Sequence, residues 1–308
     1  MPLRQSRHNE PMHPLIPFLP LLLLGVWPAA HAAEPIADIH LHYKWNQAEN
    51  TSVEEALAIL DRNDVALALV TGTPPEFALK LADADPQRFI AAYGLYQVSG
   101  GEKSRWSFDR GVLDRARQAL ASGRYRAIGE VHMIPGFMAR PTTPVVEGLL
   151  ELAAEYDVVF WLHTEFSRPD FVIELCRSHP KVRFLWAHAG SVLPADQVDQ
   201  AMDACPKLWM ELAARDPWRH RSEIISGEDG LLKPDWRALV IKHQDRVLVG
   251  SDPVWPVEQL DAWDQDDTGW QELGRFLDYH RGWLAGLPPE AAQKIRLDNA
   301  RRLFGLSQ

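Results

Sequence analysis

Eight short apolar runs, separated by segments of helical pattern, set the fold that this chain can adopt. The expected strands are residues 37–42, 65–70, 89–95, 126–131, 158–163, 182–188, 208–212 and 246–249. The expected helices are 51–63, 75–84, 109–122, 144–155, 169–177, 194–204, 236–242, 269–284 and 289–304. This alternation is typical of the α/β class and predicts a (β/α)8 (TIM) barrel, a single domain with extra C-terminal helices.

An open, doubly wound sheet is the structural alternative. The run 65–70 is apolar throughout, as expected for a strand that is buried on both faces. No glycine-rich phosphate loop follows the first expected strand, which counts against a nucleotide-binding domain of the doubly wound kind. The length of 308 residues is enough for one large barrel.

The first residues of the chain do not fit the barrel. Arg4 and Arg7 give a weakly basic start, an apolar run follows, and Ala30 and Ala32 are the small residues that a signal peptidase recognises. The apolar run contains prolines and is short for a membrane span. We therefore expect a signal peptide over 1–32 and a mature, exported domain over 33–308, periplasmic in a Gram-negative host and without stable membrane insertion after cleavage. An uncleaved anchor is the alternative.

Cys176 and Cys205 are the two cysteines of the chain. Both are expected at the same end of the alternating domain, so they could pair in an oxidising compartment. Two buried free thiols are the alternative, and the residues alone do not separate these interpretations.

Polar side chains stand at or just after the ends of five expected strands. Asp38, His40 and His42 alternate with apolar residues, so we expect them to share one face of the first strand. The later strands contribute Glu130 with His132 two residues on, His163, His188 and Asp252. In a barrel the carboxyl ends of the strands converge on one mouth, where the active sites of this fold lie.

Imidazole and carboxylate groups together suit Zn²⁺ or a similar divalent cation. Each of these residues follows an apolar run, so its side chain is expected to be partly buried and to need a partner. For any one histidine, a hydrogen bond at a strand end is the alternative explanation. The same pattern on five strands favours a metal site.

These motifs resemble the amidohydrolase superfamily, and most closely its amidohydrolase-2 branch of metal-dependent barrels. The matching segments are 38–42 on the first strand, His163 on the fifth, 187–190 on the sixth, 250–253 on the eighth and the tail 295–305. The resemblance covers essentially all of the mature chain. The motifs are specific jointly, whereas two histidines spaced by one residue are not.

The resemblance implies that His40, His42 and Asp252 bind a metal ion. His163 and His188 would complete that site or hold a second ion. Glu130 takes the position at which many relatives bridge two ions, so one or two divalent cations per chain, with Zn²⁺ as the expected metal, remain open. Asp252 would also act as the catalytic base, and His188 would stabilise the developing oxyanion if it is not a ligand.

The loop after the seventh strand is rich in arginine. Arg215, Arg219 and Arg221, with Trp218, suggest a site for a carboxylate or another anion, and Trp45 and Trp255 are expected to line the mouth. A solvated basic loop with local ion pairs is the alternative. We expect a small, anionic organic substrate. The net charge of −10 argues against a nucleic-acid partner.

The leading functional hypothesis is an exported metal-dependent hydrolase that acts on an amide, ester or lactone bond. The alternative within the same branch is a nonoxidative decarboxylase of an aromatic or unsaturated acid. A third hypothesis is a noncatalytic barrel that binds a metal or a solute. Glu130 favours hydrolysis, because the bridging carboxylate belongs mainly to hydrolases. A homodimer stays open, since barrels of this type often dimerise.

Overall fold

Eight parallel strands in chain order form the sheet of this computed structural model, which describes residues 34–97, 106–109, 111–133, 143–164, 168–219, 223–255 and 266–307. The strands are β1 (Ile36–Lys44), β2 (Val65–Thr73), β3 (Phe89–Tyr93), β4 (Tyr125–His132), β5 (Val159–His163), β6 (Arg183–Trp186), β7 (Leu208–Glu211) and β8 (Val247–Leu248). The predicted signal peptide lies outside the described residues.

Backbone hydrogen bonds complete the ring between the two ends of the sheet. The amide of Ile39 donates to the carbonyl of Val249 at 3.0 Å, and the amide of Asp252 donates to the carbonyl of His40 at 2.8 Å. The first strand therefore lies against the segment that follows β8. The predicted (β/α)8 barrel is confirmed.

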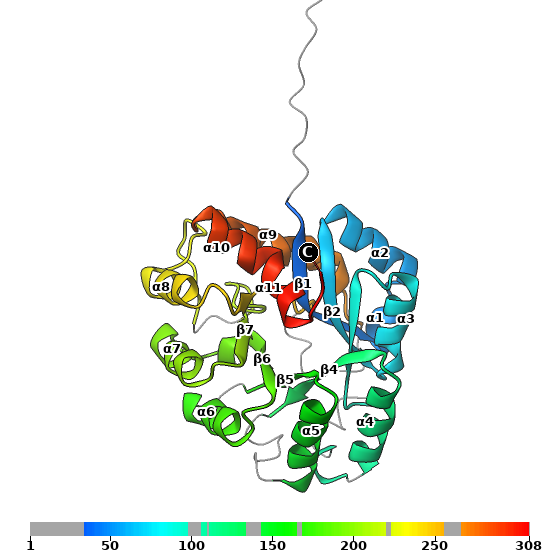
Figure 1. The fold of residues 1–308 in the computed structure, drawn as a ribbon. Coiled ribbons are helices and arrows are strands. Elements are labelled where there is room, and N and C mark those ends of the chain that lie inside the picture. The colour runs from blue at the N-terminus through cyan, green and yellow to red at the C-terminus, as the bar shows by residue number, and fades with distance from the viewer. Residues whose placement is uncertain are drawn as a thin grey trace, which may run out of the picture. The chain divides into compact units, whose positions relative to one another are not determined.

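The helices surround the strands, as Figure 1 shows. Most of them have one apolar face, which packs on the outer surface of the sheet. The helices are α1 (Trp45–Ala48), α2 (Val53–Arg62), α3 (Glu76–Ala84), η2 (Trp106–Phe108), α4 (Gly111–Ala121), α5 (Pro144–Glu155), α6 (Pro169–Ser178), η3 (Ala187–Gly190), α7 (Ala195–Ala204), α8 (Pro234–Lys242), η5 (Gly269–Glu272), α9 (Leu273–Leu284), α10 (Pro289–Gln293), η6 (Lys294–Asp298) and α11 (Asn299–Leu303).

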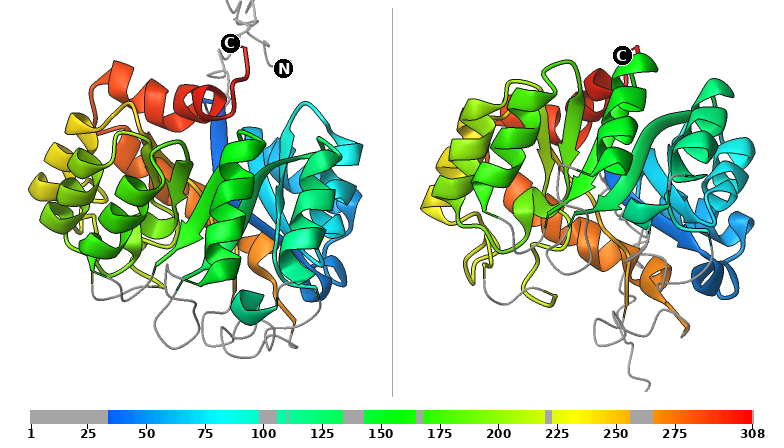
Figure 2. Two further views of the ribbon diagram at one scale, coloured as in Figure 1. Left: turned by 60° about the horizontal axis from the view of Figure 1, so that its bottom comes forward. Right: turned by 90° about the horizontal axis from the view of Figure 1, so that it is seen from below.

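A second apolar cluster fills the inside of the barrel. Its strand members include Ile39, Leu69 and Trp161, and its helical members include Leu303 and the adjoining Phe304. The last helices thus seal the amino-terminal end of the strands, opposite the arrowheads in Figure 2. Two arginines near the starts of β4 and β6 fix this seal: Arg126 donates to the carbonyl of Phe304 at 2.7 Å and Arg183 to that of Leu303 at 2.6 Å.

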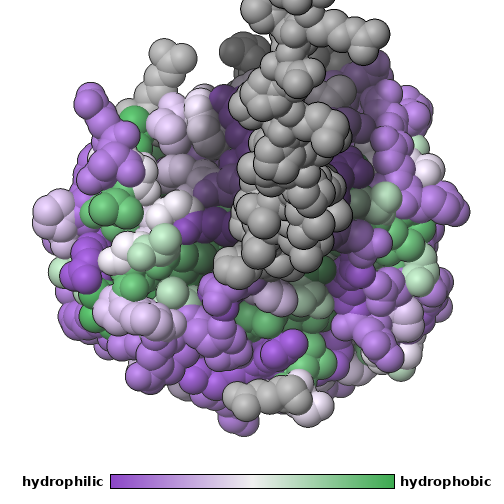
Figure 3. Space-filling model, turned by 90° about the horizontal axis from the view of Figure 1, so that it is seen from above, coloured by the Kyte–Doolittle hydropathy of each residue, from purple (hydrophilic) through white to green (hydrophobic). Residues whose placement is uncertain are grey.

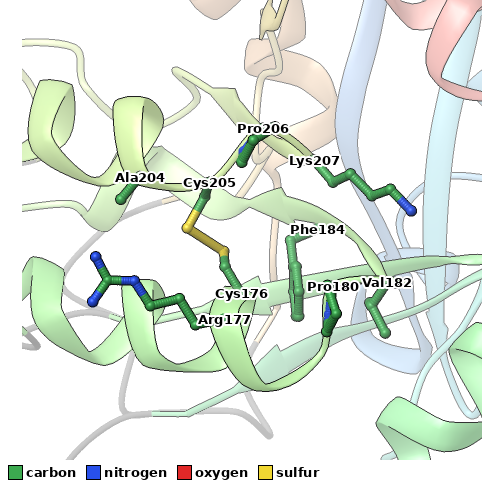
Figure 4. A pocket seen from close by; sticks show the side chains of 9 residues that line it. All are labelled: Cys176, Arg177, Pro180, Val182, Phe184, Ala204, Cys205, Pro206 and Lys207. Atoms are coloured by element: carbon green, nitrogen blue, oxygen red, sulfur yellow. A yellow bond between two sulfur atoms is a disulfide. The ribbon is translucent and has the colours of Figure 1, made fainter.

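Cys176 on α6 forms a disulfide with Cys205, which follows α7. Of the two interpretations left open by the sequence, the structure has the paired cysteines. The disulfide lines a mainly apolar cavity together with Val182 and Phe184 (Figure 4). This cavity adjoins the starts of β6 and β7, at the end of the barrel away from the carboxyl ends of the strands.

The face drawn in Figure 3 is mostly hydrophilic, with small scattered hydrophobic areas. Within the described part of the chain, large hydrophobic side chains that stand exposed are few: Phe108 and Leu231. None of the described helices combines the length and apolar character that crossing a membrane requires.

Candidate metal centre

Six side chains that the sequence singles out lie together at the carboxyl ends of the strands. His40 and His42 come from β1, Glu130 from β4, His163 from β5, His188 from the turn η3 and Asp252 from the segment after β8. The Nε2 atoms of His40 and His42 are 3.1 Å apart. Both Nε2 atoms also face Oδ1 of Asp252, at 3.6 and 3.4 Å.

Glu130 is at the middle of this group. Its Oε1 lies 2.5 Å from Nδ1 of His163 and 3.6 Å from Nε2 of His188. Its Oε2 lies 3.4 Å from Nε2 of His42 and 3.6 Å from Nε2 of His40. The side chain is only 3% exposed. The two carboxylate oxygens therefore face different sets of imidazoles.

An irregularity in β4 turns Glu130 inward. Between Ile128 and Val131 the strand has one residue more than β5, which is the count of a β-bulge. Ala127 packs inside the barrel, whereas Ile128 and Val131 pack against the helices. Glu130 thereby joins the inner face. Gly129 is needed at the bulge, because its φ is 141° and a Cβ atom there would lie 2.4 Å from the carbonyl oxygen of Trp161.

A similar irregularity in β1 corrects the expectation that Asp38, His40 and His42 share one face. Between Asp38 and Leu41, β1 has one residue more than β2. Residue Ile39 packs inside the barrel, whereas Leu41 packs outside it, so the alternation of faces reverses across this step. Asp38 instead accepts hydrogen bonds from the amides of Ser251 (2.8 Å) and His40 (3.2 Å), and supports the ligand-bearing backbone.

His188 stands in a turn with left-handed backbone. The φ angles of His188 and Ala189 are 55° and 45°, which few residues with a side chain adopt. Arg215 holds this turn: Nε donates to the carbonyl of His188 at 2.7 Å and Nη2 to that of Ala189 at 2.8 Å. Arg215 is 0% exposed. The sequence analysis expected Arg215 to contact substrate; in the structure its donors are used by buried carbonyl groups of the turn.

Asp252 also has left-handed backbone, with a φ of 47°. Arg219 donates to the carbonyl of Asp252 and, at 2.7 Å, to that of Ser251, and it forms an ion pair with Asp216 at 2.6 Å. The Asp252 side chain is 17% exposed, whereas that of Glu130 is 3% exposed. Of these two carboxylates, Asp252 is the more open to an incoming molecule.

Glu211, at the end of β7, is a functional residue that the sequence analysis missed. Its Oε1 lies 2.8 Å from Nδ1 of His40 and accepts from the amide of His188 at 2.7 Å. Its Oε2 accepts from the amide of Ala213 at 2.5 Å. The carbonyl of Ala213 lies 2.9 Å from Nδ1 of His188. Both histidines are thus held by Nδ1, which directs Nε2 to the centre, as is usual for metal-binding histidines.

The charges of the centre stabilise one another. Burial disfavours a charged His40, but the carboxylates of Asp252, Glu130 and Glu211 outweigh it and raise the pKa of His40 well above its ordinary value. Burial also disfavours ionised Glu130, yet His132, His163 and His40 hold the pKa of Glu130 well below its usual range. Burial also acts to raise the pKa of Asp252, but His40, His42 and His188 outweigh it and hold that pKa well below its ordinary value. Buried carboxylates of this kind require compensating positive charge.

The donor set fits one or two divalent cations. Three groups of potential ligands in the mouth have donor atoms within 4.8 Å of one another: His40, His188 and Asp252; His40, His42 and Glu130; and Glu130, His132 and His163. Imidazole nitrogens with carboxylate oxygens are the ligands that zinc and similar ions take in enzymes.

The residues expected to contact substrate differ in their exposure. Trp45, Trp218 and Trp255 are half-buried, and Arg221 lies outside the described residues. The guanidinium of Arg275, which the sequence analysis did not single out, lies 4.2 Å from the ring centre of Trp218 and 5.0 Å from that of Trp255. Arg275 is 37% exposed.

A family model described as amidohydrolase matches residues 26–306 of the chain. No curated protein matches it. Among solved structures, a Pseudomonas putida protein proposed to be a 2-pyrone-4,6-dicarboxylic acid hydrolase is 16% identical, covers 89% of this chain and 98% of that chain, and has a TM-score of 0.60.

Two further structures are similar over comparable lengths. An amidohydrolase from Burkholderia multivorans with bound zinc is 13% identical, covers 89% of this chain and 100% of that chain, and has a TM-score of 0.55. A dihydroxybenzoic acid decarboxylase from Polaromonas sp. JS666 with bound manganese is 11% identical, covers 89% and 98%, and has a TM-score of 0.56. At these identities the similarity to solved structures shows the fold.

Proposed function

This chain belongs to the amidohydrolase family, and we propose that it is a metal-dependent hydrolase that cleaves an amide, ester or lactone bond of a small, anionic organic substrate. The observation that carries this proposal is the position of Glu130. Its two oxygens face different imidazoles, with His163 and His188 near Oε1 and His40 and His42 near Oε2. A carboxylate so placed suits a bridge between two cations, which is typical of hydrolytic centres.

His40, His42, His163, His188, Glu130 and Asp252 would hold the cation or cations. A divalent cation supplies Lewis acidity there: it polarises a substrate carbonyl group and makes water more acidic. Asp252 is ionised, because its pKa is well below the ordinary value, and its side chain is reachable from the mouth. Asp252 therefore takes a proton from the attacking water and passes it to the leaving group. His188 is held by Ala213 and Glu211 in a ligand-like orientation.

An anionic substrate is supported by the mouth and by the similar proteins. Arg275 presents a partly exposed guanidinium between Trp218 and Trp255, a setting that suits recognition of a carboxylate beside an apolar wall. Two of the similar structures are described by carboxylic acids: a pyrone dicarboxylic acid and a dihydroxybenzoic acid. Arg275→Ala is expected to raise KM for a carboxylate substrate at least about tenfold, with metal content unchanged.

We further propose that the chain is exported. The support is the Cys176–Cys205 disulfide, since stable disulfides form in oxidising compartments, together with the signal-peptide pattern of residues 1–32. N-terminal sequencing of the protein recovered from a periplasmic extract should begin near Ala33. Recovery of the full-length chain from the cytosol alone would contradict export.

The second candidate is a nonoxidative decarboxylase, which the similarity to the manganese-containing Polaromonas enzyme favours. Isotope labelling separates the two reactions. The zinc- or manganese-loaded protein is incubated in ¹⁸O-water with lactones, esters and amides of small carboxylic acids, and with the free aromatic acids. Hydrolysis places ¹⁸O in the product carboxylate, whereas decarboxylation releases CO₂ and leaves a product without added water.

Three variants test whether turnover depends on the metal centre. Asp252→Asn is expected to lower kcat at least about 10³-fold, because the base is lost. His40→Ala is expected to lose metal as well as turnover. His179→Gln is the matched control, since His179 pairs with Glu147 among the outer helices. Full turnover by His40→Ala after chelation would rule out the proposed function.

A further inference from the structure

We propose that His132, which the proposed function does not include among the ligands, binds a second divalent cation together with Glu130 and His163, and that Tyr96 positions it. This inference rests on the proposed function, because it adds an ion to the same centre. It concerns which side chains hold that ion, and therefore how many ions the protein binds.

Strand geometry brings these three groups together. His132 follows Glu130 by two residues beyond the bulge, so both side chains lie on the inner face of β4. His132 and His163 are register partners on the neighbouring strands. Their rings stack with centroids 4.7 Å apart and an angle of 21° between the planes. The two imidazoles thus stand side by side, next to the same carboxylate.

The donor atoms point to one region. Nε2 of His132 lies 3.7 Å from Oε2 of Glu130, and Nδ1 of His163 lies 2.5 Å from Oε1. All three residues are buried, with exposed fractions of 9% or less. Their donor atoms form one of the groups that fall within 4.8 Å of one another. This group shares Glu130 with the group of His40 and His42. It shares no member with the group of His40, His188 and Asp252.

His132 has a hydrogen-bond partner on Nδ1, as His40 and His188 also have. Nδ1 of His132 lies 2.8 Å from the hydroxyl of Tyr96, and that hydroxyl also accepts from the amide of His132 at 3.3 Å. The corresponding partners are Glu211 for His40 and the carbonyl of Ala213 for His188. Tyr96 stays neutral, because burial raises its pKa above the ordinary value. An outer partner on Nδ1 fixes the ring with Nε2 on the side of Glu130, 3.7 Å from its Oε2, which is the orientation that metal-binding histidines have.

Ligand numbers agree with two ions. The three groups in the mouth contain seven side chains: His40, His42, His132, His163, His188, Glu130 and Asp252. A single zinc ion takes about four or five ligands, one of them water in a catalytic site. His132 and His163 therefore exceed what an ion at His40, His42, His188 and Asp252 needs, and Glu130 connects the two sets.

Metal content of purified protein tests this assignment without reference to turnover. Four purified proteins are compared: wild type, His132→Gln, Tyr96→Phe and the control His179→Gln. Each is stripped with chelator, reloaded with Zn²⁺ or Mn²⁺ and analysed for bound metal per chain. Wild type and His179→Gln are expected to bind about two ions, and His132→Gln about one. Tyr96→Phe is expected to keep both ions but to hold the second about 10–100-fold more weakly, because the outer partner of His132 is lost.

Electron paramagnetic resonance of the manganese-loaded proteins gives a second readout. Two Mn²⁺ ions that share Glu130 give an exchange-coupled spectrum in wild type, and His132→Gln is expected to give the spectrum of an isolated ion. Two ions in both His132→Gln and wild type would overturn the role of His132 and leave the metal-dependent hydrolase standing. A single ion in wild type would overturn the role of His132 and would also remove the two-cation bridge that favours hydrolysis over decarboxylation. A wild type that binds no metal would overturn both proposals. Tyr96→Phe provides the answer if His132→Gln does not fold.

Discussion

Replacing Glu211 by glutamine is expected to damage both the stability and the metal affinity of the protein, although the two side chains have nearly the same shape. In the structure Oε1 accepts from the amide of His188 and lies 2.8 Å from Nδ1 of His40, while Oε2 accepts from the amide of Ala213. Both oxygens are therefore acceptors. A glutamine side chain has one acceptor oxygen and one NH₂ donor.

Either orientation of the glutamine amide creates a conflict. With the oxygen toward His40 and His188, the NH₂ group faces the amide of Ala213. With the glutamine side chain reversed, its NH₂ group faces the backbone amide of His188 and the ring nitrogen of His40. A hydrogen bond to a charged group contributes about 1.5–3 kcal/mol, and a buried donor without an acceptor costs about 1–3 kcal/mol more. We therefore expect metal-free Glu211→Gln to lose roughly 3–6 kcal/mol of unfolding free energy.

Urea unfolding of the metal-free protein, followed by circular dichroism, measures this loss, and a competitive zinc titration measures affinity. Affinity is expected to fall about 10–100-fold, because His40 loses its outer carboxylate. Glu151→Gln, an exposed position on α5, is the matched control and should change stability by less than about 0.5 kcal/mol. If Glu211→Gln behaved like Glu151→Gln in both assays, Glu211 would not orient the ligands as argued.

Three further predictions follow from other parts of the structure. Reduction of the Cys176–Cys205 disulfide, which spans 29 residues, should lower the unfolding free energy by about 3–4 kcal/mol; equal urea midpoints with and without reductant would contradict it. Burial lowers the pKa of His280 to about 4, so the folded protein binds fewer protons than the unfolded chain and loses stability as pH falls from about 6.5 toward 4. His280→Gln should remove about 2–3 kcal/mol of this loss between pH 7 and 4.5, and an unchanged pH dependence would show that His280 is not responsible. Arg219→Leu removes donors from the backbone of Asp252 and should lower kcat about 10–100-fold with bound metal unchanged; a wild-type kcat would refute this role.

The order and type of the main elements were predictable because a barrel needs them in strict alternation. Each strand is buried between the interior and the helices, which requires a continuous apolar run. The ends of elements were less predictable. The strand β6 was expected to reach residue 188 but ends at Trp186, because His188 and Ala189 turn away with left-handed backbone. The short helices α1 and η2 were not predicted, since so few residues carry little periodicity.

The residues brought together at the mouth could be predicted from their positions at strand ends, but their directions could not. Strict alternation assigns Asp38 to the face of His40, and the extra residue in β1 reverses that assignment. The bulge in β4 moves Glu130 inward in the same manner. A one-residue insertion is visible only against the partner strand, so a single sequence does not reveal it.

Partners of buried polar groups were the least predictable part. Glu211 carries the same signal as the ligands that it supports, since it ends the apolar run of β7. The sequence places Arg215 in a basic loop, which suggests a substrate-binding arginine. In the structure, its donors are used by carbonyl groups of a turn that is more than twenty residues away in sequence. Such pairings depend on which backbone groups are left without donors after folding.

The seal formed by η6 and α11 also affects when the protein acquires its native state. These segments follow all eight strands in the order of synthesis, yet Leu297, Ala300, Leu303 and Phe304 supply the inner floor of the barrel. Until they emerge from the ribosome, the inner apolar face of the strands stays open to water, and Arg126 and Arg183 lack the carbonyl groups that they bind. A nascent chain of this kind reaches its stable form late. That delay is compatible with the export proposed above, because a polypeptide threaded through a secretion pore has to be unfolded.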